Sequence, residues 1–140
     1  MDGALFVFII ACVLLDVDGV LAEVSQSYRA SIIETAAFFN VSITSLDIEV
    51  LKQRGSANND WQVTHHFVQS SFPDVTLAIV TDKFEEIYHG TASKKGLSWT
   101  ETLIPSIGLL KEIHRRMQGK VGLVTGRPRR DCQEFIDRFQ

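Results

Sequence analysis

The sequence predicts an α/β fold in which a parallel sheet is interrupted after its first strand by an all-helical segment. The apolar run Ala4–Leu15 is typical of a buried strand. Residues 24–98 repeat their apolar side chains with helical spacing, and a second short apolar run, Lys120–Thr125, lies between two predicted helices. Strands that alternate with helices indicate a parallel sheet. We therefore expect residues 1–23 and 99–140 to form the sheet-containing core around the insert.

The composition is that of a globular protein. Of the 140 residues, 45% are hydrophobic and 22% are charged, which fits one domain, or one domain and part of another. The net charge of -3 predicts no nucleic-acid binding. Cys12 and Cys132 stand in apolar patterns, so we expect two small core side chains rather than a disulfide or a metal site.

The N-terminal apolar run, Ala4–Leu15, is too short for a membrane helix, which needs roughly 20 residues. No Lys or Arg precedes the run, although a signal peptide begins with a positively charged region. We therefore expect a strand, in a cytoplasmic protein that makes no membrane contact. An N-terminal signal or an organelle-targeting segment is the alternative.

The inserted segment predicts four helices and no strand. Their expected positions are Tyr28–Phe39, Leu46–Gln53, Trp61–Phe72 and Leu77–Ile87. The expected N-terminal caps are Ser25 or Ser27, Thr44 or Ser45, Asn59 or Asp60, and Asp74. Residues 91–98 are expected to form a solvated linker. A further helix, with Pro105 in its first turn, is expected from Leu103 to Met117.

Two carboxylates, Asp16 and Asp18, stand where the first strand is expected to end, just before Gly19. Ligands of open α/β sheets bind at the carboxyl ends of the strands. Two adjacent carboxylates repel each other unless a cation or a shared proton intervenes, and Mg²⁺ takes carboxylate oxygens together with substrate phosphate. The pair therefore predicts a magnesium site for chemistry on a phosphate. An ordinary Asp- and Gly-rich turn is the alternative.

The second short strand is followed by Thr125, Gly126 and Arg127. Parallel strands end at the same edge of a sheet, so these residues are expected beside the two aspartates. A hydroxyl, a glycine amide and a guanidinium can bind phosphate oxygens, and the N-terminus of the next helix adds N–H groups and a positive dipole end. The alternative is a simple strand-to-helix turn with Pro128 at the start of the helix.

The two segments resemble known motifs. Asp16–Leu21 resembles the first motif of the haloacid dehalogenase (HAD) superfamily of phosphohydrolases, and Val124–Pro128 resembles the second. The helical insert resembles the cap of the subfamily that includes phosphoglycolate phosphatase and β-phosphoglucomutase. Gly55–Trp61 is similar to a narrower branch of HAD-like hydrolases, some of which are linked by name to histidine biosynthesis. The resemblance implies a partial HAD-like Rossmannoid core with a cap.

The resemblance also implies an activity: Mg²⁺-dependent hydrolysis of a phosphate monoester, with a small phosphorylated metabolite as substrate. Asp16 would be the nucleophile that forms an aspartyl-phosphate, and Asp18 would be the general acid and base. Asp16 and the backbone carbonyl of Asp18 would hold Mg²⁺. Thr125, Gly126 and Arg127 would bind the phosphoryl oxygens. The oligomeric state is left open.

The sequence also departs from the family. HAD enzymes carry a third motif, a Lys or Arg, and a fourth, acidic motif downstream of the second. Lys94 and Lys95 lie upstream, and Asp131 and Asp137 lie on the next predicted helix, so none of them matches. We therefore expect the N-terminal part of a HAD hydrolase, weakly active or inactive alone. The alternatives are a non-catalytic phosphate-binding or partner-binding remnant and, less compatible with the helical insert, a receiver-like signalling domain.

The helical insert offers five candidate substrate contacts. A lid must reach the active site to select a substrate, which favours the polar side chains near its second and third helices: Lys52, Arg54, Asn58, Asn59 and Asp60. In the alternative interpretation, Asn59 or Asp60 only caps the third helix, and Lys52 and Arg54 are solvated.

Overall fold

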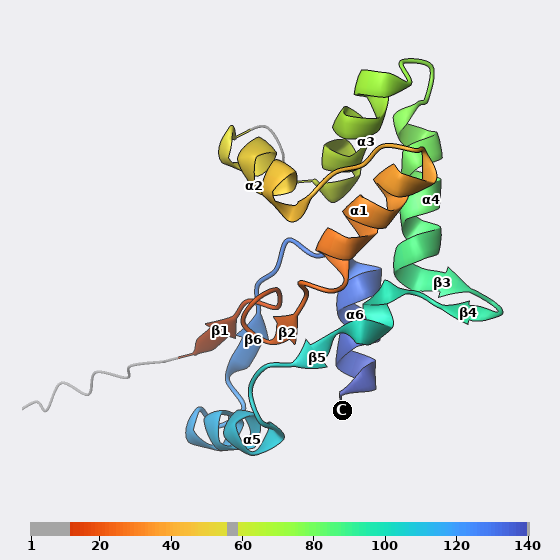
Figure 1. The fold of residues 1–140 in the computed structure, drawn as a ribbon. Coiled ribbons are helices and arrows are strands. Elements are labelled where there is room, and N and C mark those ends of the chain that lie inside the picture. The colour runs from red at the N-terminus through yellow and green to blue at the C-terminus, as the bar shows by residue number, and fades with distance from the viewer. Residues whose placement is uncertain (1–11, 56–58, 140) are drawn as a thin grey trace, which may run out of the picture. The chain divides into compact units, whose positions relative to one another are not determined.

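The computed structural model describes residues 12–55 and 59–139. The chain divides into two compact units (Figure 1). Unit 1 contains Met1–Ala22 and Leu103–Gln140, and unit 2 contains Glu23–Thr102. The chain is mixed α/β, as the sequence predicted. The assignment of the two predicted segments to a core and a lid stays a prediction.

Unit 1 contains a parallel pair of strands, β1 (Val13–Leu15) and β6 (Val121–Leu123). The two strands lie side by side in Figure 1. Val13 is in register with Val121 and Leu15 with Leu123, which confirms the predicted parallel pairing. The N–H of Val124 donates to the carbonyl of Leu15 at 3.0 Å, so the pairing extends to the carboxyl ends. Residues 4–11 of the predicted first strand lie outside the described residues.

The helices of unit 1 are α5 (Ile107–Arg116) and α6 (Arg129–Arg138). Where the chain leaves unit 1 and returns, β2 (Ala22–Glu23) pairs with β5 (Thr102–Leu103). The predicted start of α5 at residue 103 is wrong. The helix begins after Ser106, whose side chain accepts a hydrogen bond from the backbone N–H of residue 109, and Leu103 is in β5 instead.

The apolar side of unit 1 is incompletely covered in the described part of the chain. No residue of α5 is buried, and Leu109 is 52% exposed. Cys12 is exposed and Cys132 only half-buried, so the prediction of two core cysteines is wrong.

Within the described residues, no helix is long and apolar enough to cross a membrane.

Unit 2 contains the four predicted helices. They are α1 (Tyr28–Phe38), α2 (Ser45–Gln53), α3 (Asp60–Ser71) and α4 (Leu77–His89). Helices α1, α3 and α4 pack against one another, and α2 contacts α1 and α3. Their apolar faces meet in one buried cluster formed by Ile32, Ile48, Leu51, Val63, Phe84 and Tyr88. The helical spacing of apolar residues included Ile32 and Phe84 of this cluster, but also Phe72 and Leu77, which are 41% and 39% exposed, so it located the core only in part.

The prediction that the insert is all-helical is wrong after α4. A short antiparallel hairpin follows, with β3 (Gly90–Thr91) paired to β4 (Lys94–Lys95), and then a 3-10 helix, η1 (Leu97–Thr100). Gly90 has φ +86°, and a Cβ at Gly90 or at Gly96 would collide with the backbone of the facing segment. Two glycines thus allow a close backbone crossing, which helical periodicity cannot reveal.

Polar side chains cap three helices of unit 2. Asn59 caps α3 by accepting from the N–H of Gln62, in agreement with one predicted alternative. Thr76 caps α4, so the prediction that Asp74 caps this helix is wrong. Asp74 lies two residues before Thr76 in the sequence. In α2, Thr44 and Asp47 form a reciprocal capping box.

The capping box predicts that the Thr44 side chain and the pKa of Asp47 are coupled. Hydrogen bonds from Thr44 lower the pKa of Asp47. Replacing Thr44→Ala is expected to return the pKa of Asp47 toward its ordinary value, as measured by NMR titration of the carboxyl group. The pKa of Asp47 is lower in the folded state than in the unfolded state. The capping box therefore stabilises the folded state fully above the unfolded-state pKa, and this stabilisation is lost as pH falls through the folded-state pKa. Thr91→Ala, on the hairpin, is the control; an unchanged Asp47 pKa in Thr44→Ala would refute the coupling.

Candidate functional site at the strand ends

The carboxyl ends of β1 and β6 form one edge of unit 1 (Figure 1). Asp16–Gly19 follow β1, and Thr125–Arg127 follow β6 after one intervening residue. The parallel register brings these two segments to the same edge. We call Asp16–Gly19 together with Thr125–Arg127 the strand-end edge. It gathers every candidate residue that the sequence placed in the sheet-containing core.

A tight turn shapes the first half of the edge. The backbone N–H groups of Leu21 and Ala22 both donate to the carbonyl of Val17, at 2.9 and 2.7 Å, and Val17 is fully buried. Gly19 has φ +74°, a conformation that glycine adopts without strain. The Asp16 carboxylate accepts from the N–H of Val17 at 2.7 Å. The turn thus anchors Val17 inside and leaves the Asp16 side chain exposed.

An ion pair joins the two halves. The Nε and Nη2 of Arg127 donate to Oδ1 of Asp18 at 2.9 and 2.5 Å. The Arg127 side chain is 0% exposed and that of Asp18 is 38% exposed. The guanidinium carbon also lies 5.4 Å from the centre of the Phe135 ring. The sequence predicted that Arg127 binds phosphate directly, whereas the structure shows a buried guanidinium that fixes Asp18; direct phosphate binding by Arg127 stays a prediction.

The two aspartates differ in their surroundings. Asp18 has its charge balanced by Arg127, whereas Asp16 is exposed and accepts its hydrogen bond from its own turn. Among the described residues, no group of three or more His, Cys, Asp or Glu side chains could hold a metal ion. Mg²⁺ is often held by only one or two carboxylates plus substrate phosphate. Asp16 fits such a minimal site.

The second half of the edge offers hydrogen-bond donors. The Thr125 hydroxyl oxygen accepts from the N–H of Arg127 at 3.1 Å, which leaves the hydroxyl proton available to a ligand. A Cβ added at Gly126 would meet none of the described atoms within 4 Å, so the backbone there is open to approach. Helix α6 begins directly afterwards, at Arg129, and presents its positive dipole end.

One carboxylate near this edge was missed. Asp131 is only 6% exposed, in the first turn of α6. The sequence placed it on a helix and gave it no role, because it matched no motif. An acidic residue in a first turn is stabilised by the helix dipole, and that position was the available signal.

The candidate substrate residues of the insert lie in unit 2. Lys52 Nζ and Asp60 Oδ1 form an ion pair at 2.7 Å that joins α2 to α3. Asn59 caps α3, and Arg54 is the exposed residue at the end of α2. Asn58 lies outside the described residues. These contacts give Lys52, Asn59 and Asp60 structural roles, and substrate contact stays a prediction.

In chemical terms, the strand-end edge combines hydrogen-bond donors with an exposed carboxylate at the ends of two parallel strands. A curated protein of Phytophthora nicotianae named imidazoleglycerol-phosphate dehydratase is 50% identical to this chain over 133 residues. The match covers 91% of this chain but 29% of the relative, so the chain spans less than a third of the relative's length. No family model matches the chain. No solved structure matches it either.

The name of this relative contradicts the prediction of a HAD-type phosphatase. A dehydratase removes water from its substrate, whereas a phosphatase cleaves the phosphate ester, so the predicted hydrolase and phosphatase chemistry is wrong. The alternative of a non-catalytic remnant is not supported, because the relative is an enzyme. The two motifs gave the wrong reaction because their residues specify the turns that follow two parallel strands. Similar turns occur in enzymes that catalyse unrelated reactions. A phosphorylated small molecule remains compatible with the relative's name.

Proposed function

We propose that this chain is part of an imidazoleglycerol-phosphate dehydratase and that its strand-end edge binds the phosphate group of the substrate. The observation that carries the proposal is the ion pair between Asp18 and Arg127, which ties the ends of β1 and β6 together. Thr125 and Gly126, the proposed donors, lie between the end of β6 and Arg127, so the pair would restrict their movement. The relative with 50% identity supplies the substrate class.

The phosphate would be bound mainly by hydrogen bonds. The Thr125 hydroxyl, the Gly126 amide and the first N–H groups of α6 follow closely after β6 along the chain, and we propose that they bind the phosphate oxygens together. A hydrogen bond to a charged group contributes about 1.5–3 kcal/mol. Since Asp18 already balances the charge of Arg127, the phosphate charge needs another partner. Arg129, exposed at the start of α6, is the nearest candidate in sequence.

Asp16 would provide the exposed carboxylate of the site. Removal of water breaks a C–H bond and a C–O bond and forms a C=C bond, so it needs a group that accepts a proton and one that donates a proton. An exposed carboxylate beside the bound phosphate can exchange a proton with the substrate or hold Mg²⁺. Bound magnesium would offset the phosphate charge. A cytoplasmic location also stays a prediction.

Replacing Thr125→Val tests the phosphate site. The substitution keeps the shape of the side chain and removes the hydroxyl, both as a donor to the ligand and as the acceptor for the Arg127 N–H, so the affinity for imidazoleglycerol phosphate is expected to fall by about tenfold or more, as measured by isothermal titration calorimetry. Inorganic phosphate should compete with the ligand. Thr91→Val, on the β3–β4 hairpin of unit 2, is the matched control and should bind like the unaltered chain. Equal affinities for all three proteins would rule out phosphate binding at the strand-end edge.

A further inference from the structure

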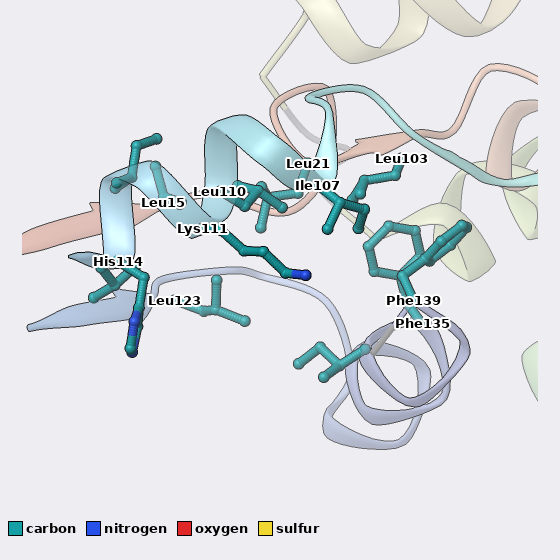
Figure 2. A pocket seen from close by; sticks show the side chains of 13 residues that line it. Leu15, Leu21, Leu103, Ile107, Leu110, Lys111, His114, Leu123, Phe135 and Phe139 are labelled. Atoms are coloured by element: carbon teal, nitrogen blue, oxygen red, sulfur yellow. The ribbon is translucent and has the colours of Figure 1, made fainter. Parts of the chain in front are cut away.

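An open apolar groove of about 700 Å³ lies within unit 1 (Figure 2). Its floor includes Leu15 of β1 and Leu123 of β6, and its walls include Leu110 of α5 and Phe135 of α6. Figure 2 shows these side chains, contributed by both strands and both helices, around one hollow. The groove therefore lies where a folded core would be expected to continue.

The lining side chains of the groove are apolar, apart from Lys111 and His114, which both belong to α5. Ile107, which lines the groove, is 43% exposed, and Leu109 of the same helix is 52% exposed. Exposed apolar side chains at an open groove favour a protein interface.

The shape and polarity of the groove favour a helix as its occupant. A helix satisfies its own backbone N–H and C=O groups, so it can enter a groove that offers few hydrogen-bond partners. Helices also cover the faces of parallel sheets, and two strands do not make an independently stable sheet. An amphipathic helix that places its apolar face between α5 and α6 would cover Ile107 and Leu110.

We propose that this groove receives an amphipathic helix from the part of the dehydratase polypeptide that lies outside the matched segment. The inference rests on the proposed function. The match covers 29% of the relative, so more than two thirds of that protein is available to supply the helix. The groove would then be the surface through which this chain joins the rest of the enzyme.

Cysteine alkylation can test the proposal. Ile107→Cys, at the groove, and Ile79→Cys, exposed on α4 of unit 2, are made in this chain and at the aligned positions of the full-length relative. At position 107 the alkylation rate is expected to be at least tenfold lower in the full-length protein than in this chain. At position 79 the two rates should be similar. A photo-crosslinker at position 107 of the full-length protein should capture a peptide from outside the matched segment.

Two results would overturn this inference. One is fast alkylation at position 107 in both proteins. The other is slow alkylation at position 107 in the isolated 140-residue chain, together with a dimer in sedimentation velocity. A second copy of the chain would then be the occupant of the groove. Failure of this inference can be distinguished from failure of the proposed phosphate site. Thr125→Val should leave the protection at position 107 unchanged, and Ile107→Cys should leave the affinity for imidazoleglycerol phosphate unchanged.

Discussion

Replacing Asp18→Ala is expected to destabilise unit 1 by about 2–3 kcal/mol, because it removes the carboxylate that accepts two hydrogen bonds from the buried Arg127 guanidinium. Losses from breaking a fully buried pair reach about 3–5 kcal/mol, and the 38% exposure of the Asp18 side chain reduces the expected value. Urea unfolding followed by the NMR signals of unit 1 amides would measure the loss.

Asp16→Ala is the matched control for this measurement. Asp16 is exposed and bonds to the N–H of the next residue, so its removal is expected to cost less than about 1 kcal/mol. Asp18→Asn, which keeps an oxygen acceptor, should fall between the two. If Asp18→Ala and Asp16→Ala have the same stability, the ion pair does not hold the strand ends together.

Replacing Phe84→Ala is expected to destabilise unit 2 by about 3–5 kcal/mol. Phe84 is 1% exposed and belongs to the buried cluster, with its ring centre 6.2 Å from that of Tyr88. The neighbouring helices cannot collapse fully into the cavity that the ring would leave. Fluorescence of Trp61, whose indole N–H donates to Glu85 of the same unit, would follow unfolding.

Phe38→Ala provides the comparison for Phe84→Ala. Phe38 is 58% exposed on α1, with the Lys83 ammonium 4.1 Å from its ring centre. Losing that contact is expected to cost about 1 kcal/mol or less. A similar loss of stability in both variants would show that the cluster around Phe84 is not the core of unit 2.

The helices of unit 2 could be predicted because their signals are local. Apolar residues three and four positions apart indicated the helices and part of their buried faces, and Thr44 and Asn59 stood where caps belong. The β3–β4 hairpin could not be predicted in this way. It depends on the close approach of Gly90 and Gly96, a contact between backbones that leaves no periodic pattern.

The common position of the candidate residues was predictable, but their contacts were not. The alternation of strands and helices predicted a parallel sheet, and this placed Asp16, Asp18 and Thr125 at one edge. The burial of Arg127 was not predictable, because it depends on a partner 109 residues away in the sequence. The reaction class was predicted wrongly, since turn motifs specify the shape of the backbone more closely than the bond that is broken.

Titration of the ¹⁵N-labelled chain with imidazoleglycerol phosphate tests the central claim most directly. Shift changes are expected to concentrate on the amides of Asp16–Gly19 and Thr125–Arg130, while the ³¹P signal shows that the phosphate ester remains intact. Absence of shift changes, or changes confined to unit 2, would contradict phosphate binding at the strand-end edge. Release of inorganic phosphate would contradict the assignment to a dehydratase.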